Sequence, residues 1–224
     1  YIIDGVRVSG SLKLPQDAIE QLEVITGGVD PKYGDATGGF ITITTRGPAK
    51  DYNGSIELAS SQYLDDYGYN LASLFLTGPF IVKNKGTDSA VAKFGFFLAG
   101  ELEMEKDPDP SATDVWAVKG DVMQSLIDDP LRPSVTGAGF NKNSEFITKD
   151  DLETIGARDN VNNYGLSLNS KLDYKFSKNT NLQLGLSWRK FHANTYSRNF
   201  ALFNAENNPV DDQNTYRGYL RFTQ

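Results

Sequence analysis

Acidic side chains are the first candidates for chemistry in this sequence of 224 residues. Two neighbouring carboxylates are what the acid–base hydrolysis of a glycoside needs. The sequence has three adjacent pairs of aspartates that we considered for this role: Asp65-Asp66, Asp150-Asp151 and Asp211-Asp212. Adjacent side chains on a strand point to opposite faces, and acids near turns are usually solvated. We therefore expect no enzyme, and a soluble sugar-binding or hydrolytic β-protein is only an alternative class.

Metal binding is the second kind of chemistry to consider. Glu105, Asp107 and Asp109 alternate as calcium ligands can, but prolines separate them and no Gly-containing loop motif follows. The sequence has no Cys and a single His, His192, which excludes Cys-ligated and multi-histidine metal centres. His192 follows the apolar end of a strand, and we expect an interfacial or loop residue rather than a ligand. We expect no cofactor and no resident metal.

The net charge of −7 is concentrated in one segment. Residues 101–129 contain nine acids and two bases, whereas the rest of the chain has 20 of each. This pattern predicts one acidic insertion in a charge-balanced scaffold, either a solvated loop or a surface that attracts cations. A sequence pI near 4.8 argues against a nucleic-acid partner.

Long alternating segments after about residue 53 predict the elements that must position these groups. Between 162 and 176, apolar residues recur at every second position and polar residues lie between them. Six such strands are predicted, at 53–62, 70–80, 93–103, 162–176, 182–188 and 215–223. Basic residues fall on the faces opposite the apolar ones: Lys171, Lys175, Arg189, Arg217 and Arg221.

Strand length favours a transmembrane barrel over a soluble sheet. The 162–176 segment has 15 residues, whereas soluble strands usually have five or six. Aromatic residues near both ends, Tyr164 at one and Tyr174 and Phe176 at the other, are typical of the girdles of a membrane barrel, as is Trp188 in the next strand. A half-exposed soluble sheet is the alternative. No run of 18 apolar residues predicts a transmembrane helix.

The predicted connections are short on one side of the sheet and mostly long on the other. Residues 177–181 form a tight turn, whereas the connection 104–160 and the connection of about 18 residues between the last two strands are long, as extracellular loops are. The segment 64–68 is short and departs from this trend. Within 104–160, Val115, Val118, Val122 and Leu126 fall on one helical face, and Thr148 with Asp151 predicts a capping box.

Residues 1–47 have a different character, with short elements separated by glycines. Asp4-Gly5 predicts a tight hairpin turn, and residues 14–20 predict a short helix with Pro15 near its start. Strands are expected at 22–25 and 40–45. This segment therefore predicts a small α+β unit.

The order of residues in this unit resembles the plug domain of TonB-dependent outer-membrane transporters, in a form similar to Bacteroidetes members. An Ile-Glu-x-x-Glu-Val strand is followed by Gly-Gly, Tyr-Gly, a second Gly-Gly and a strand that ends in Thr-Thr-Arg. The plug-motif residues are Asp4, Gly5, Ile19, Glu20, Glu23, Gly27, Gly28, Tyr33, Gly34, Gly38, Gly39 and Arg46. For the glycines, the expected role is turn geometry.

The resemblance implies a mainly β chain in two parts. Residues 1–50 would be the C-terminal part of the plug, and 51–224 would be antiparallel barrel strands, about six of an expected 22, with a long extracellular loop at about 104–160. Because six strands cannot close such a barrel, we expect the chain to be a fragment.

The implied function is active transport of an unidentified ligand across the outer membrane of a Gram-negative bacterium, with the plug as gate. The implied partners are outer-membrane lipid, the TonB energy-coupling protein acting through a segment absent here, and a surface lipoprotein or other outer-membrane subunits. The alternative is a receptor-like scaffold or accessory subunit of a larger outer-membrane complex.

Two features of the motif limit what the resemblance implies. Thr26-Gly27 stands where many relatives have Arg-Gly, so we expect no arginine contact from that position. The sequence around Tyr33 is not the form typical of glycan importers. Glu20 and Glu23 are either partners of barrel arginines or ordinary exposed carboxylates.

Overall fold

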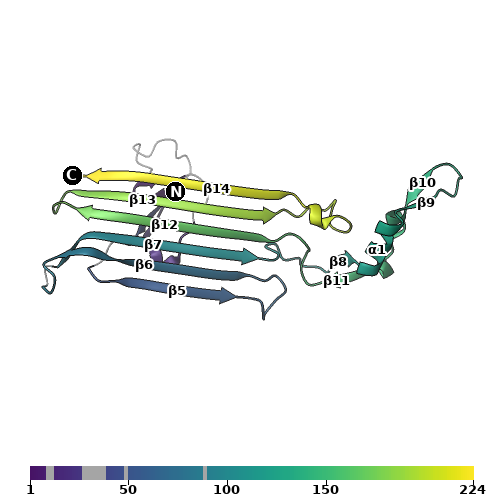
Figure 1. Cartoon of the computed structure of the whole chain (residues 1–224), viewed down its shortest axis with the longest axis horizontal. Coiled ribbons are helices and arrows are strands. Elements are labelled where there is room, and N and C mark those ends of the chain that lie inside the picture. The colour runs from purple at the N-terminus through teal and green to yellow at the C-terminus, as the bar shows by residue number, and fades with distance from the viewer. Residues whose placement is uncertain (9–12, 27–38, 48–49, 88–89) are drawn as a thin grey trace.

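A computed structural model describes residues 1–8, 13–26, 39–47, 50–87 and 90–224. Its main element is a six-stranded sheet in which every neighbouring pair of strands is antiparallel (Figure 1). The strands, in spatial order, are β14 (Val210–Thr223), β13 (Asn181–Asn194), β12 (Asn163–Lys175), β7 (Val91–Glu105), β6 (Asn70–Lys83) and β5 (Asn53–Ser60). All six predicted strands are therefore confirmed, and the fold class is mainly β.

Several strands are longer than the sequence predicted. β13 continues to Asn194 and β14 begins at Val210, whereas apolar alternation predicted 182–188 and 215–223. In the extension of β13 the face that was apolar continues with Lys190, His192 and Asn194, so apolar periodicity gives no signal there. These residues extend the two strands because Arg189 to Asn194 pair in register with Thr215 to Val210.

Connections alternate in length between the two ends of the sheet. Residues 84–90 and 176–180 make short turns at one end, and residues 61–69, 106–162 and 195–209 connect strands at the other. The short predicted segment 64–68 is part of the 61–69 connection, so it lies on the long-loop side. Short connections therefore lie at one end of the sheet and longer ones at the other, without the exception that the sequence suggested at 64–68.

The 106–162 connection, which we call the outer arm, extends beyond the end of the sheet (Figure 1). It contains β8 (Val115–Val118), α1 (Gly120–Asp128), β9 (Leu131–Pro133), β10 (Phe140–Lys142), the 3-10 turns η3 (Asn143–Phe146) and η4 (Lys149–Asp151), and β11 (Leu152–Ile155). The single helical face predicted for this segment is wrong for Val115 and Val118, which pair with β11 as a strand. The capping box of Thr148 and Asp151 is confirmed at η4.

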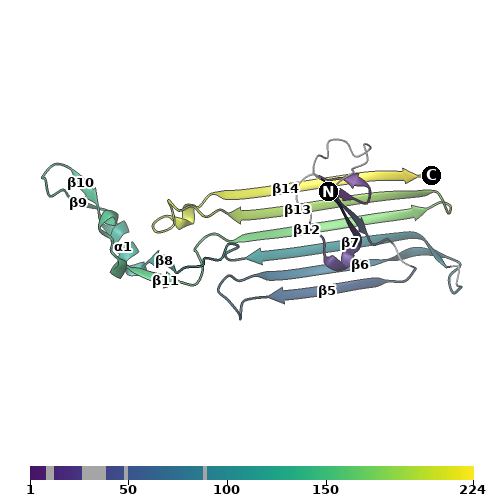
Figure 2. The ribbon, with the colours of Figure 1, turned by 180° about the vertical axis from the view of Figure 1, so that it is seen from behind.

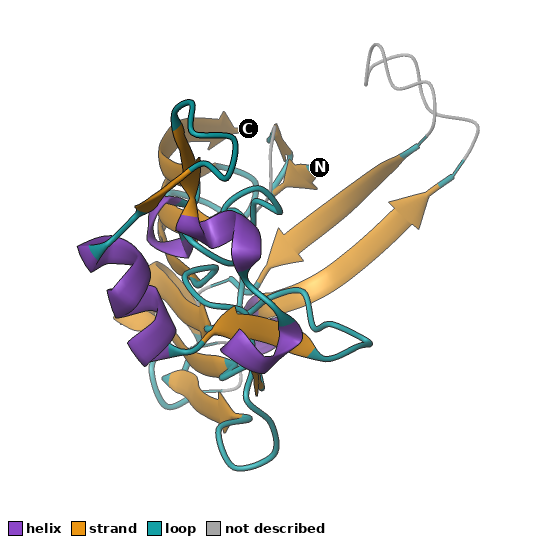
Figure 3. Ribbon diagram, turned by 90° about the vertical axis from the view of Figure 1, so that its right-hand side faces the viewer, coloured by secondary structure: helices purple, strands orange, loops and turns teal. Residues whose placement is uncertain are grey.

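Residues 1–47, which we call the N-terminal unit, lie on one face of the large sheet (Figure 2). The unit contains β1 (Ile2–Ile3), β2 (Val6–Arg7), the 3-10 turn η1 (Gln16–Ala18), β3 (Ile19–Ile25) and β4 (Phe40–Thr45), in the sheet order β2-β1-β4-β3. The Asp4-Gly5 turn is confirmed, with positive φ angles of 48° and 79°. The β3–β4 hairpin stands away from the large sheet (Figure 3).

The two faces of the large sheet differ in composition and in burial. The face under the N-terminal unit, the covered face, carries polar residues of β12 that are at least nine-tenths buried: Ser167, Asn169, Lys171 and Asp173. The opposite, open face carries apolar residues, of which Leu168 is 40% and Leu172 39% exposed. This is the reverse of a soluble sheet, in which the apolar face is the buried one.

Candidate functional site

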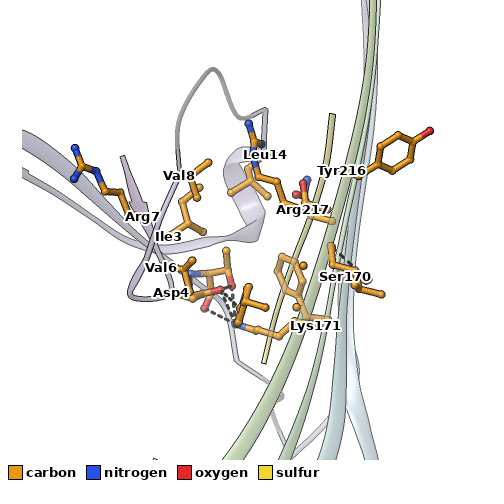
Figure 4. Close-up of a pocket in the computed structure, with 18 residues that line it drawn as sticks. Ile3, Asp4, Val6, Arg7, Val8, Leu14, Ser170, Lys171, Tyr216 and Arg217 are labelled. Carbon is orange, nitrogen blue, oxygen red and sulfur yellow. Dashed lines mark hydrogen bonds and ion pairs between the residues drawn. The ribbon is translucent and has the colours of Figure 1, made fainter. Parts of the chain in front are cut away.

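The covered face meets the N-terminal unit in a polar network centred on Asp4. The left-handed backbone of the Asp4-Gly5 turn directs the Asp4 side chain toward the end of β4. One carboxylate oxygen accepts a hydrogen bond from the Thr45 backbone N–H at 2.9 Å, and the other accepts one from the Thr45 hydroxyl at 2.7 Å. Asp4 thus joins the β1–β2 turn to β4 (Figure 4).

Lys171 on β12 connects this turn to the large sheet. Its ammonium donates to the Thr45 hydroxyl at 2.6 Å and lies 3.4 Å from the Asp4 carboxylate. Both charged side chains are buried, with 5% of Lys171 and 8% of Asp4 exposed. The ammonium also lies 5.3 Å from the centre of the Phe97 ring. A buried pair with this many partners is strongly destabilised when one partner is removed.

β14 adds a second set of contacts to the same turn. The Arg221 guanidinium donates to the Asp4 backbone carbonyl at 2.7 Å, and the Tyr219 hydroxyl lies 3.4 Å from the Asp4 carboxylate. A side chain at Gly5 would place its Cβ 2.8 Å from Arg221 Nη1. Only glycine at position 5 therefore allows both the positive φ and the close approach of Arg221.

A second contact area lies over β6, β7 and β12. Lys13 donates to Glu103 at 2.7 Å, and its backbone carbonyl accepts from the Asn169 amide at 3.3 Å. The hydrogen bond to Glu103 raises the pKa of Lys13, which opposes the effect of partial burial. This ion pair fixes the segment that precedes η1.

The main apolar core is at the same interface. Ala18 of η1 packs against Phe75 and Phe97, whose ring centres are 5.7 Å apart. Ala99 completes the buried cluster and Leu14 covers it. The interface therefore contains both the buried ion pair and the largest apolar cluster of the described residues.

A cavity of about 440 Å³ remains between the N-terminal unit and strands β12 to β14. Its lining combines apolar residues, among them Ile3, Val6 and Leu14, with charged ones, of which three are basic (Arg7, Lys171 and Arg217) and one, Asp4, is acidic. In Figure 4, Lys171 and Arg217 point toward the N-terminal unit. Because of this cavity, the N-terminal unit contacts the sheet in separate areas, the Asp4 network and the area around Lys13 and Ala18, and does not pack against it throughout.

The predicted motif residues differ in what the structure shows of them. Asp4 and Gly5 are at the centre of the network, and Arg46 lies over the Phe75 ring at 5.9 Å. Gly39 has a φ of 119° and a Cβ there would lie 2.4 Å from the Ile25 carbonyl, which is a turn-geometry role. Ile19 begins β3 and pairs with Thr45. The remaining motif glycines and the tyrosine lie outside the described residues: Gly27, Gly28, Tyr33, Gly34 and Gly38.

The idea that Glu20 and Glu23 pair with barrel arginines finds no support. Both are exposed on β3, and neither forms an ion pair with another described residue. Instead, the carboxylate that meets the basic covered face is Asp4, through Lys171. Sequence reasoning had placed Lys171 and Arg221 on this face but had not identified Thr45, Lys13 or Tyr219 as partners.

Asp107, a buried carboxylate of the acidic segment, forms an ion pair with Arg158 of the same outer arm. Arg158 donates to both oxygens of Asp107, through Nε at 2.9 Å to one and through Nη2 to the other, and also to Asp109 at 3.2 Å. Burial would raise the pKa of Asp107, but the hydrogen bonds from Arg158 outweigh it and lower that pKa. Among the described residues, no group of three or more metal-binding side chains is found. The calcium hypothesis for this segment therefore gains no support.

The single histidine lies in a structural contact at the loop end of the sheet. His192 Nδ1 is 2.7 Å from an Asp212 carboxylate oxygen, and its ring stacks on Tyr164 at 5.0 Å.

No described helix is both long and apolar enough to cross a bilayer.

Comparison with known proteins gives a likeness in structure alone. No family model and no curated protein matches the chain. A double mutant of the ferric enterobactin receptor PfeA of Pseudomonas aeruginosa is 16% identical, with a TM-score of 0.54 over 98% of this chain. A single mutant of the same receptor in complex with enterobactin is 17% identical, with a TM-score of 0.54 over 96% of this chain. The chain covers 29% of either receptor chain.

These neighbours define the fold. The chain has a fold like that of TonB-dependent receptors, mainly β with antiparallel strands. The matched structures are receptors and not enzymes, in agreement with the prediction from the sequence. At this level of identity the likeness extends to the fold and not to a ligand.

Proposed function

We propose that the chain is part of a TonB-dependent transporter that moves a ligand across the outer membrane of a Gram-negative bacterium of Bacteroidetes type. In this proposal residues 1–50 are part of the plug, and residues 51–224 are barrel strands that carry the outer arm. The plug acts as a gate: force transmitted by the TonB protein displaces it and opens a path, without bond chemistry.

The inverted burial of the large sheet is the observation that carries this proposal. Polar side chains lie under the N-terminal unit, whereas the open face is apolar from Tyr164 to Tyr174 on β12. The ten steps between these two residues span ~33 Å along a strand, which a tilt of about 40° reduces to roughly 25 Å. That is the height of the apolar band of an outer-membrane barrel.

Aromatic residues at both limits of this band support the same placement. At the turn end, Phe80, Phe94, Tyr174 and Phe176 form a chain of ring contacts with centres 4.7 to 6.0 Å apart. At the loop end, Tyr164 stacks on His192 with ring centres 5.0 Å apart, and the stacked pair of Trp188 and Tyr216 lies further inside the band, beside Leu168. Aromatic girdles at the two membrane interfaces have this arrangement.

The decisive experiment deletes the gene for TonB in a strain that depends on the full-length protein for growth. We expect ligand-dependent growth to be lost. The double variant Asp4→Cys with Lys171→Cys, cross-linked by a bifunctional methanethiosulfonate that bridges the gap left by the lysine side chain, should also abolish uptake and recover it on reduction. The natural sequence has no Cys, so no other disulfide interferes within this segment. Uptake that survives both treatments would contradict transport by plug displacement.

The outer arm favours a second candidate, a receptor-like scaffold in a larger outer-membrane complex. It exposes large apolar side chains beyond the end of the sheet, with Val135 fully exposed, Phe140 69% and Ile127 64% exposed. A surface of this kind suits a partner such as a surface lipoprotein. Growth unaffected by loss of TonB, together with loss of a co-purifying subunit on deletion of residues 120–142, would favour this candidate.

A further inference from the structure

A groove of about 580 Å³ crosses the open face of the sheet. One row of paired residues forms its floor: Leu98, Ser170, Leu186 and Gly218. Ser170 has a small side chain and Gly218 has none, so the surface is hollowed at these two positions, next to the larger side chains of Leu98 and Leu186. Figure 4 shows Ser170 and Tyr216 on the side of the sheet that faces away from the N-terminal unit. The groove and the cavity at the covered face are thus bordered by the same stretch of β12 to β14, and Ser170, Leu186 and Gly218 line both.

Two aromatic residues form the wall of this groove on the side of the long loops. Trp188 and Tyr216 stack with ring centres 6.4 Å apart and an interplanar angle of 17°. Both line the groove together with Leu168. A flat aromatic wall beside an apolar floor gives an extended chain of methylene groups many close contacts.

A cation follows the aromatic wall on the same face of β13. Lys190 is the next open-face residue after Trp188, and its ammonium lies 5.6 Å from the centre of the Tyr164 ring. It forms no ion pair with any described residue. The nearest open-face acid of its neighbours, Asp212, is already paired with His192. Lys190 is thus available to an anion at the loop end of the groove.

We propose that this groove binds an acyl chain of a phosphorylated, multiply acylated lipid of the outer leaflet, with the lipid phosphate on Lys190. The order along β13 is apolar at Leu186, aromatic at Trp188 and cationic at Lys190, over ~13 Å. An anionic lipid has the same order from chain to headgroup. The loop end of the sheet is the extracellular end in the proposed function, on which this inference rests, and this places the groove in the outer leaflet.

The test is native mass spectrometry of the full-length protein, extracted from its own outer membrane in a mild detergent. Lys190→Gln removes the anion partner, and Ser170→Leu with Gly218→Leu fills the floor. At Gly218 a Cβ would meet only the flexible end of Leu186, at 3.2 Å, and the Gly185 carbonyl at 3.8 Å. Leu220→Phe is the matched control, because it adds bulk to the same face outside the groove.

We expect Lys190→Gln to lower the retained lipid about fivefold, the factor that corresponds to one basic side chain at an anionic membrane surface. The filled groove should lower it at least as far, and the control should retain it. Equal retention by all variants would overturn the proposal, as would retention of a two-chain phospholipid alone, or a dimer of the protein that the filled groove abolishes.

Fluorescence separates failure of this inference from failure of the proposed function. The segment has two tryptophans, so Trp116→Phe, with any tryptophan elsewhere in the full-length chain also replaced, leaves Trp188 as the reporter. In vesicles of phosphatidylcholine brominated on its acyl chains, we expect quenching of Trp188. No quenching would contradict the membrane placement itself. Quenching combined with unchanged lipid retention in the variants would overturn the groove proposal alone.

Discussion

The two faces of β12 have opposite surroundings although they alternate along the same 13 residues. Lys171 on the covered face is 5% exposed and makes three polar contacts with the N-terminal unit. Leu172, its neighbour, lies on the open face and is 39% exposed. The stability of the covered face therefore depends on specific partners, whereas that of the open face depends on the solvent that surrounds it.

This contrast separates two physical effects that usually act together. In a soluble sheet, burial and apolar character coincide, and the hydrophobic effect orders both faces. Here the buried face is polar along β12 and gains order there from hydrogen bonds in fixed geometry, next to one apolar cluster at Phe75, Phe97 and Ala99. The open face gains stability only when an apolar medium replaces water around it.

The largest effect should come from breaking the covered face at its centre. Asp4→Ala leaves the Lys171 ammonium and the Thr45 hydroxyl without their shared carboxylate, and the expected loss is ~3–5 kcal/mol in the free energy of unfolding of the N-terminal unit. Protease resistance of residues 1–47 in the full-length protein measures it.

A double-mutant cycle gives the control for this prediction. Lys171→Met removes the buried charge, so Asp4→Ala should cost much less in that background. Equal losses in both backgrounds would show that the Asp4–Lys171 contact does not hold the plug.

The open face should respond to a charge in the opposite way from the covered face. Leu186→Arg places a cation near the middle of the apolar band, with an expected cost of ~2–4 kcal/mol in vesicles. Ser187→Glu on the same strand places a charge on the cavity side of the sheet, directly opposite Arg217, and should cost little. Guanidinium unfolding in vesicles measures both. A similar cost for the two variants would remove the distinction between the faces.

The ion pair of Asp107 and Arg158 at the base of the outer arm is a buried polar contact outside the sheet, and it can be compared with the covered face. Since hydrogen bonds from Arg158 lower the pKa of Asp107, its contribution to stability is complete above the unfolded pKa of about 4 and is lost as the pH falls through the lower, folded value. Asp107→Asn should weaken the joint by ~1.5–3 kcal/mol at neutral pH. Hydrogen exchange of the arm at neutral and acidic pH measures this. Exchange of Asp107→Asn that equals wild type at neutral pH would contradict it.

The strands and their faces could be predicted because each follows from a local rule. Alternation between 162 and 176 fixed which residues share a face, and the structure confirms this assignment. The outer arm was harder, because Val115 and Val118 have a helical spacing but pair with β11. Tertiary pairing of short segments overrides periodicity in such cases.

The network at Asp4 was beyond prediction for a different reason. Its partners Thr45, Lys171 and Tyr219 come from three strands separated by up to 215 residues. The Asp-Gly pair signals a turn, but nothing local shows which basic residue of the wall meets it. From the sequence, Glu20 and Glu23 were either partners of barrel arginines or exposed carboxylates, and Asp4 was assigned only a turn.

The smallest expected effect tests whether the Asp4-Gly5 turn serves the network or only the hairpin. Gly5→Ala forces a side chain into the left-handed region, at a cost of ~1–2 kcal/mol, and its Cβ would meet Arg221 at 2.8 Å. In an Arg221→Ala background the clash disappears while the backbone strain remains. We therefore expect partial recovery of protease resistance in the double variant relative to Gly5→Ala. No recovery would mean that Arg221 does not press on the turn, and that the N-terminal unit is held mainly through Lys171.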